Sequence, residues 1–336
     1  MSRAETTVLL MLAVATSLSA PGCSRKPTPL DEVTLRLNWA PSAEHAFIYL
    51  GKDKGFFQRR KLDLHILPGE GSTVVAQLVG NGTNDFGLIS GDILVMAKLK
   101  GVPLTAVAVL YHESPATIYS LKEKGITLPK QLEGRRLGVL IKSTTYQQYQ
   151  GVLRNAGVRR DRIIEVPVSG NVQELLSGPV DAAMHYTNYL PVQIRYLGRQ
   201  VNEILMKDYG IRIYSQSIVA NDAYIARNRA LTQRFVDAML ESLEYSEPHV
   251  AEALASLLRH NPELGGALQE QMLKRTNQLL FSARPPGFGI GYMTTEGWEQ
   301  TQDTLLAVGL IDKRMAAGSF CDNGFWQAYR ASRRKP

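Results

Sequence analysis

Short apolar runs with a period of two alternate along the chain with longer apolar runs at helical spacing. Alternating runs predict strands over 33–37 and 62–66, a short buried strand is predicted over 86–89, and a further strand is predicted over 106–110. The intervening runs predict helices over 46–57, 73–79 and 92–99, with glycines near their ends. Strands and helices in this alternating order predict a sheet of parallel strands with right-handed crossovers.

The same pattern starts again after Gly125 and Pro129. It predicts strands over 136–141, 162–166 and 180–183, and helices over 147–156 and 172–176. A further strand over 214–220 would return the chain to the first unit. We therefore predict two α/β lobes, in which residues 33–121 and 214–336 form lobe 1 and residues 122–213 form lobe 2.

The C-terminal part of lobe 1 is predicted to be mostly helical. Apolar residues from Leu231 to Leu243 share one helical face, and helices are also expected over 250–259, over 267–281 and from Thr294 onward. The basic run 333–335 is predicted to be a solvated tail.

The N-terminus carries an apolar stretch, Thr6–Ala20, that is shorter than the roughly 20 residues a membrane-spanning helix needs. It is typical of the apolar region of a secretory signal. Because Cys23 follows, residues 1–22 resemble a bacterial lipoprotein signal, with Cys23 lipidated and 23–32 as a linker. This predicts a membrane-anchored protein of the periplasm; a signal cleaved near Ala20 or an uncleaved anchor are the alternatives.

Composition and absent motifs narrow the function. The chain has 336 residues, of which 44% are hydrophobic and 21% charged, as expected for a soluble globular protein of about two domains. Two cysteines exclude a disulfide scaffold and a cysteine-based zinc module. The sequence has no zincin, nucleophile-elbow or P-loop motif, and the glycine-rich run 287–291 follows prolines rather than a strand. We therefore predict no catalytic residues, metal, cofactor or nucleic-acid partner.

The segment 37–49, followed by Gly55-Phe56-Phe57, resembles the opening of the NMT1/THI5-like family. Its core is a Trp-x-Pro-x-x-x-His pattern from Trp39 to His45. Further matches lie at 82–87, 178–182 and 208–210, with weaker ones at Trp298 and 321–325. The resemblance implies a type II periplasmic-binding-protein fold, in which two α/β lobes are joined by two crossover strands and the ligand lies in the cleft.

The candidate ligand-binding residues follow predicted strands or begin predicted helices, where ligands of open α/β sheets bind. They are Trp39, His45, Gly71, Ser72, Tyr186, Asn188 and Tyr189. The indole of Trp39 offers a flat surface on which a planar heterocycle can stack, and the helix start at Gly71 and Ser72 suits an anionic group. The alternatives are structural: lobe packing for Trp39 and the tyrosines, and helix capping for the others.

The resemblance implies a monomeric solute-binding protein that captures a planar heterocycle, similar to a thiamine pyrimidine precursor, for the permease and ATPase of an ABC importer. Relatives that bind this pyrimidine carry a Glu after the Asn of the second-lobe segment, where this chain has Leu190. A flavin, or a sulfonate- or nitrate-type anion, therefore remains open as the ligand.

Two other classes stay open. One is a thiamine-pyrimidine synthase, whose family branch draws on a histidine that aligns with His45, on pyridoxal phosphate and on iron; the cysteine-rich iron motif of that branch is missing here. The other is a sensory or structural protein that uses the same fold without a ligand.

Overall fold

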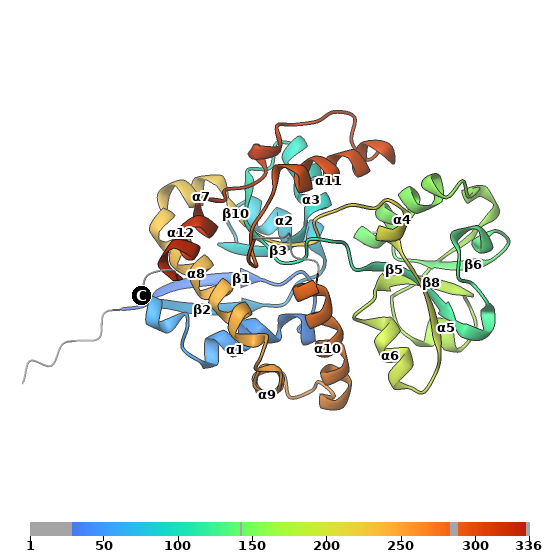
Figure 1. Ribbon diagram of the computed structural model, residues 1–336, viewed down its shortest axis with the longest axis horizontal. Coiled ribbons are helices and arrows are strands. Elements are labelled where there is room, and N and C mark those ends of the chain that lie inside the picture. Colours follow the sequence, from blue (N-terminus) through green and yellow to red (C-terminus); the bar gives the residue numbers. More distant parts are fainter. Residues whose placement is uncertain (1–28, 142, 283–287, 334–336) are drawn as a thin grey trace, which may run out of the picture.

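Two five-stranded sheets organise the molecule, each in its own lobe (Figure 1). The computed structural model describes residues 29–141, 143–282 and 288–333. The predicted signal and the predicted lipidation of Cys23 lie outside these residues. None of the described helices is both long enough and apolar enough to cross a bilayer.

The sheet of lobe 1 has the strand order β2-β1-β3-β10-β4. Its strands are β1 (Asp31–Arg36), β2 (Leu62–Leu67), β3 (Phe86–Ser90), β4 (Leu104–Val109) and β10 (Gln216–Asn221). Strand β1 is parallel to β2 and β3, whereas β10 is antiparallel to β3 and β4. The predicted return strand is confirmed, but the sheet is mixed rather than parallel, because that strand enters between β3 and β4 in the opposite direction.

The sheet of lobe 2 has the order β7-β6-β8-β5-β9. Its strands are β5 (Ala116–Leu121), β6 (Arg136–Val139), β7 (Ile164–Pro167), β8 (Ala182–Tyr186) and β9 (Val201–Leu205). Strand β6 is parallel to β7 and β8, and β5 is antiparallel to β8 and β9. The sequence pattern predicted neither β5 nor β9, and the expected lobe boundary after residue 121 had left β5 in lobe 1.

Two chain segments, 110–115 and 206–215, connect the sheets and lie against each other. The N–H of Leu110 donates to the carbonyl of Gln216 at 2.7 Å, and the N–H of Ser215 donates to the carbonyl of Tyr111 at 2.9 Å. The lobes are thus joined by a pair of hydrogen-bonded segments, each of which leads into a strand of the other lobe's sheet.

Helices cover both faces of the lobe 1 sheet. They are α1 (Ala46–Asp53), α2 (Ser72–Gly80), α3 (Gly91–Leu99), α7 (Asp222–Arg227), α8 (Arg229–Ser246), α9 (Val250–His260), α10 (Gly266–Ser282), α11 (Thr295–Ala307) and α12 (Gly324–Arg333), with 3-10 turns η1 (Ala43–His45), η2 (Gln58–Arg60) and η7 (Ala317–Ser319). The rings of Phe86 and Phe235 stack 3.7 Å apart in the core on one face, and Trp298 is fully buried in the core on the other.

Lobe 2 is smaller and carries fewer of the described helices. They are α4 (Thr144–Asn155), α5 (Gln173–Leu176) and α6 (Leu190–Tyr196), with 3-10 turns η3 (Lys122–Lys124), η4 (Pro129–Leu132), η5 (Arg160–Arg162) and η6 (Met206–Tyr209). The fully buried Tyr149 and Leu137 anchor its main core.

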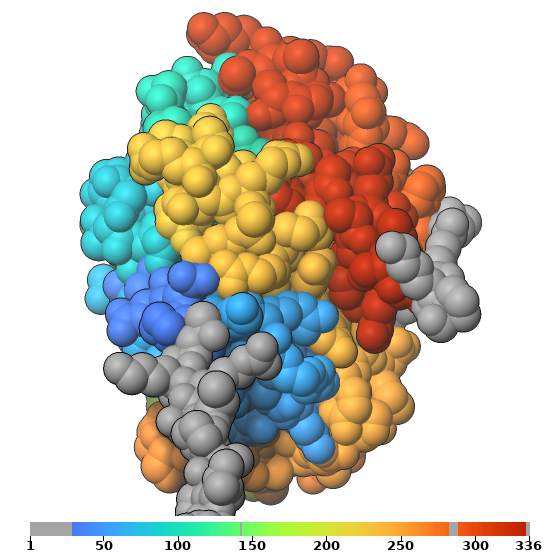
Figure 2. All heavy atoms as spheres, turned by 90° about the vertical axis from the view of Figure 1, so that its left-hand side faces the viewer, coloured from blue at the N-terminus to red at the C-terminus, as the bar shows by residue number. Residues whose placement is uncertain are grey.

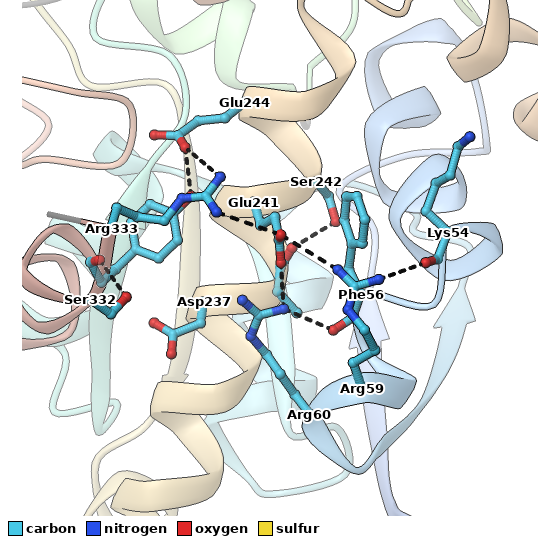
Figure 3. A network of polar contacts seen from close by, with 12 residues as sticks. Lys54, Phe56, Arg59, Arg60, Asp237, Glu241, Ser242, Glu244, Ser332 and Arg333 are labelled. Carbon is cyan, nitrogen blue, oxygen red and sulfur yellow. Dashed lines mark hydrogen bonds and ion pairs between the residues drawn. The ribbon is translucent and has the colours of Figure 1, made fainter. Parts of the chain in front are cut away.

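Helix α12 lies on the outer face of lobe 1, against the segment that contains α8 (Figure 2). Its last residue, Arg333, forms ion pairs with Glu241 at 3.7 Å and Glu244 at 3.6 Å, both on α8 (Figure 3). Glu241 also accepts a hydrogen bond from Arg60 at 2.5 Å. Arg333 therefore ends an attached helix and is not part of the predicted solvated tail, whose other residues, 334 and 335, lie outside the described residues.

Candidate functional site

A cavity of about 340 Å³ lies between the two lobes, at the carboxyl ends of several strands. This volume is within the range of small-molecule sites, roughly 300–1,000 Å³. Lobe 1 contributes Asn38, Trp39, Glu44, Glu70, Gly71, Ser72 and Thr73, and lobe 2 contributes Leu140, Ser143, Thr144, Thr145, Ser169, His185, Tyr186, Asn188 and Tyr189. Every predicted ligand residue except His45 is therefore at the cavity wall.

Two glycines bring the loop after β2 against the end of β1. A Cβ added at Gly69 would lie 1.8 Å from the carbonyl oxygen of Leu37, so only glycine fits there. Gly71 has a φ of +106°, and its N–H donates to the carbonyl of Asn38 at 2.9 Å. This close approach places the indole of Trp39 beside Gly71, with 38% of the Trp39 residue still exposed.

Aromatic rings form much of the opposite wall. The rings of His185 and Tyr189 stack 4.8 Å apart and 20° from parallel, and Tyr186 meets His185 edge-on. His185 Nδ1 accepts the N–H of Tyr186 at 2.8 Å, which leaves the proton on Nε2. Burial lowers the pKa of His185 to about 4 and raises the pKa of Tyr186 to about 12. All three rings are therefore neutral at physiological pH.

A buried hydrogen-bond network supports the lobe 1 wall. His45 Nδ1 accepts the N–H of Ser42 at 3.3 Å, so Nε2 donates to Asn38 Oδ1 at 2.8 Å. The same oxygen accepts a hydrogen bond from Gln216 Nε2 at 3.0 Å, while Asn38 Nδ2 donates to Glu44 Oε1 at 3.1 Å. Three partners thereby fix the orientation of the Asn38 side-chain amide.

His45 does not line the cavity. It is fully buried, and burial lowers its pKa to about 3, so the ring is neutral. The structure places it behind Asn38, through which it contacts the cavity. The sequence predicted a ligand contact for His45, whereas the structure places this residue behind the cavity wall, with protein partners at both ring nitrogens.

Glu44 is a cavity residue that the sequence interpretation did not single out. Its side chain is 10% exposed, and burial raises the pKa of its carboxyl to about 7, against which the Asn38 hydrogen bond acts. Burial therefore favours the protonated form of this carboxyl group. Its position five residues after Trp39 was visible in the sequence, but nothing in the spacing showed that it would turn inward.

Each lobe also directs the start of a helix at the cavity. Ser72 begins α2, and its Oγ accepts the N–H of Ser90 at 3.1 Å. Ser143 caps α4, and its Oγ accepts the N–H of Tyr146 at 3.2 Å. Helix starts present N–H groups that suit acceptor or anionic ligand atoms. The Ser-Thr-Thr run 143–145 is a helix-cap signal after a predicted strand, so the reasoning applied to Ser72 could have found it.

Asn188 connects lobe 2 to the C-terminal helices of lobe 1. Its Nδ2 donates to Thr276 Oγ1 on α10 at 2.9 Å. Asn188 is 4% exposed, and its side chain also interacts with the buried hydroxyl of Tyr111. Leu190, two residues on, is 3% exposed in the lobe 2 core and does not line the cavity.

The chain belongs to a family of two-lobed proteins: the family model described as NMT1/THI5 like matches residues 42–253. Among its relatives is the riboflavin-binding protein RibY of Chloroflexus aurantiacus, 26% identical over 306 residues, which span 88% of this chain and 86% of that protein. Another is the 4-amino-5-hydroxymethyl-2-methylpyrimidine phosphate synthase of Candida albicans, 27% identical over 258 residues, or 73% of this chain and 76% of the synthase.

The fold is also that of a solved binding protein. The periplasmic aliphatic sulphonate binding protein SsuA from Escherichia coli superimposes with a TM-score of 0.68 at 16% identity, over 86% of this chain and 91% of that one. The expected architecture of two α/β lobes is therefore confirmed, as is the membership of the NMT1/THI5-like family.

Proposed function

We propose that this protein is an extracytoplasmic solute-binding protein that encloses a small planar heterocycle between its lobes. The observation that carries the proposal is the cavity with Trp39 on one wall and Tyr186 and Tyr189 on the other. Flat aromatic faces on two sides favour a flat ligand, because stacking requires parallel or edge-on rings. Its membership of a family that includes a riboflavin-binding protein and a pyrimidine phosphate synthase supports the same ligand class.

Binding in this proposal depends on closure of the lobes about the segments 110–115 and 206–215. We place the lobe boundaries at these segments, so that lobe 2 spans 116–205. The ligand would stabilise the closed arrangement because it contacts both walls at once, which gives it a higher affinity for that state. Release to a membrane permease and its ATPase would follow reopening, and no covalent step is needed.

The location is proposed from the sequence. The apolar stretch Thr6–Ala20 and Cys23 support export and a lipid anchor that would keep a monomeric receptor beside an ABC importer. Such anchoring requires more than one acyl chain to be stable.

A small anion is the second candidate ligand. The helix starts at Ser72 and Ser143 face the cavity from both lobes, an arrangement that suits a sulfonate or carboxylate. The synthase alternative is disfavoured by His45, because that histidine is fully buried and held by Ser42 and Asn38.

The test is to identify what the protein carries. Protein purified without refolding is denatured, and the released small molecules are analysed by mass spectrometry. Refolded protein is then titrated calorimetrically with riboflavin, 4-amino-5-hydroxymethyl-2-methylpyrimidine and an aliphatic sulfonate. We expect one of the two heterocycles to bind. Binding of the sulfonate alone would favour the anion, and failure of all three together with an empty release fraction would overturn the proposal.

A further inference from the structure

Helix α10 of lobe 1 lies beside α6 of lobe 2 (Figure 1). It packs on α9 and η1 within its own lobe, yet none of the described residues that line the ligand cavity belongs to it. Val192 of α6 is buried in the same apolar cluster as Met272 and Leu273 of α10. The two lobes therefore share a small core beside the cavity, in addition to the two segments that connect them.

Two adjacent residues of α10 contact two adjacent residues of the loop after β8. Thr276 is 1% exposed, and its Oγ1 accepts a hydrogen bond from Asn188 Nδ2 at 2.9 Å. The guanidinium of Arg275 donates to Thr187 Oγ1 at 3.1 Å, and Thr187 is fully buried. Thr187 in turn donates to Glu203 of β9. The bonds from Asn188 and Arg275 thus both cross between the lobes.

The buried hydroxyl of Tyr111, in the connecting segment 110–115, joins this contact. It interacts with both Thr276 and Asn188. Burial raises the pKa of Tyr111 well above its ordinary value, so the hydroxyl keeps its proton. One polar junction therefore contains a group from each lobe and a group from a segment that connects them.

The loop in contact with α10 lies between two tyrosines of the cavity wall. Tyr186 and Tyr189 both line the cavity, and only Thr187 and Asn188 separate them in the sequence. Because the loop is this short, a displacement of Asn188 displaces both rings. The contacts on α10 therefore fix the aromatic wall of lobe 2 relative to lobe 1.

The same face of α10 also supports the wall of lobe 1. Gln269 is 5% exposed, and its Oε1 accepts the N–H of Ala43 at 2.8 Å, next to the cavity residue Glu44. Gln269 and Thr276 are seven residues apart, which is about two turns of helix, so they share one face of α10. One helix outside the cavity thus contacts the segments behind both of its walls.

We propose that α10 is a latch for the closed arrangement, and that Thr276 is a positioning residue that raises the ligand affinity without touching the ligand. The inference rests on the proposed function and adds to it the residues that control closure. When lobe 2 moves away from lobe 1, Asn188 separates from Thr276 and becomes hydrated. When the lobes close, the buried bond forms again. A bond made only in the closed arrangement increases the closed population, and the apparent affinity rises with it.

The latch should act on the release of the ligand rather than on its capture. The ligand enters while the lobes are apart, when Asn188 and Thr276 are not in contact. The bond must break before the ligand can leave, so it slows dissociation. Without the Thr276 hydroxyl, the Asn188 amide loses its acceptor in the closed arrangement, and a buried donor without a partner is costly. We therefore expect weaker binding that arises from faster dissociation.

The experiment compares the native protein with Thr276→Val and Thr276→Ser, using riboflavin and 4-amino-5-hydroxymethyl-2-methylpyrimidine as the probes. Valine keeps the shape of threonine and removes the hydroxyl, so Thr276→Val should lose at least about fivefold in affinity. In stopped-flow fluorescence its dissociation rate should rise by the same factor, with an association rate within about twofold of the native value. Serine keeps the hydroxyl, so Thr276→Ser should bind within about twofold of the native affinity.

Lys274→Gln is the matched control, because Lys274 lies on the exposed side of α10 and pairs with Glu270 of the same helix. It should keep the native affinity and both native rates, and thermal melts should show that each variant is folded. If Thr276→Val does not fold, Arg275→Met tests the other bond between the lobes and should release the probe at least about twofold faster. A native dissociation rate in that variant would contradict the latch.

The outcomes separate the latch from the proposed function. A native affinity in Thr276→Val, a loss that comes from the association rate alone, or an equal loss in Thr276→Ser overturns the latch and leaves the proposed function intact. If neither probe binds the native protein, the proposed function fails and the inference with it.

Discussion

The sheets of the two lobes have the same strand arrangement, yet the lobes contribute different walls to the cavity. In each sheet, the second strand in the spatial order (β1 or β6) is parallel to both of its neighbours, and the fourth strand (β10 or β5) is antiparallel and directly follows a segment that connects the lobes. Lobe 1 adds a buried polar network behind Trp39, whereas lobe 2 adds stacked rings and a serine-capped helix. The cavity walls therefore differ in the side chains at strand ends and helix starts, and the shared sheet topology determines where those segments meet.

The loop after β2 in lobe 1 and the loop after β7 in lobe 2 show the difference most clearly. In lobe 1 a Cβ at Gly69 would lie 1.8 Å from the backbone oxygen of Leu37. In lobe 2 the corresponding loop contains Gly170, where a Cβ would lie 3.4 Å from the side chain of Leu140. The lobe 1 loop is packed backbone against backbone, whereas the lobe 2 loop touches a side chain that can move.

The largest expected loss of stability tests the difference between these two loops directly. Gly69→Ala should destabilise the protein by about 2–4 kcal/mol, because the new Cβ overlaps a backbone atom. Gly170→Ala should lose about 1–2 kcal/mol, since alanine must adopt its left-handed φ of +85° without a backbone clash. Urea unfolding of both variants measures the difference, with Gly265→Ala as a control in open space. Equal losses at Gly69 and Gly170 would contradict the assigned difference between the loops.

The lobes are also tied together near the hinge. Gln148 of α4 donates through Nε2 to Asp92 of α3 at 3.2 Å and accepts from Ser114 at 2.6 Å. Asp92 is fully buried, and burial raises the pKa of its carboxyl. Gln148→Leu leaves both partners without this link and should lower the free energy of unfolding by about 1–3 kcal/mol. Chemical denaturation tests this, and an unchanged midpoint would show that the link adds nothing.

Removal of the stacking wall should affect binding more than folding. Trp39→Ala should weaken the affinity for the bound heterocycle by at least about 1–2 kcal/mol, because stacking and burial are lost together. Since 38% of Trp39 is exposed, the melting temperature should change little. Calorimetry measures the affinity, with Tyr196→Ala on α6 as the control for an exposed aromatic residue outside the cavity. A native affinity in Trp39→Ala would place the ligand elsewhere.

The smallest effect is expected on the outer face of lobe 1. Arg333 is 47% exposed, and its ion pairs with Glu241 and Glu244 are 3.6–3.7 Å long (Figure 3). Arg333→Ala should therefore cost less than about 1 kcal/mol, as exposed ion pairs usually do. The loss should shrink further at high salt. A larger loss in thermal unfolding would mean that the attachment of α12 controls the stability of the lobe.

Much of the fold could be predicted because its strands and helices have clear periods. Strands β1 to β4 and helices α8 to α11 fall where the pattern placed them. The direction of a strand leaves no trace in its own residues, so the antiparallel entry of β10 was not predictable. Strand β5 was missed because the polar residues Thr117 and Ser120 interrupt its apolar residues, although all of Ala116–Leu121 is buried.

The lining of the cavity was predictable where it follows from backbone position. Trp39, Gly71 and Tyr186 were found because they follow strands or begin helices. His45 was expected at the cavity but lies behind its wall, whereas Glu44, for which nothing was predicted, lines the cavity, since which of two adjacent side chains reaches a cavity depends on tertiary packing. His185 was missed because β8 ends at Tyr186, three residues beyond the end of the strand predicted over 180–183.

The position of β10 inside the lobe 1 sheet determines the order in which a newly synthesised chain can complete its two sheets. Strands β3 and β4 both pair with β10, residues 216–221, which are synthesised after the whole of lobe 2. The strands of the lobe 2 sheet, β5 to β9, are consecutive in the sequence, so all of them are synthesised before β10. Until β10 is made, the edges of β3 and β4 that pair with it in lobe 1 lack this partner. For roughly the first two-thirds of its synthesis, the chain thus lacks the strand that joins β3 to β4 in the sheet of lobe 1.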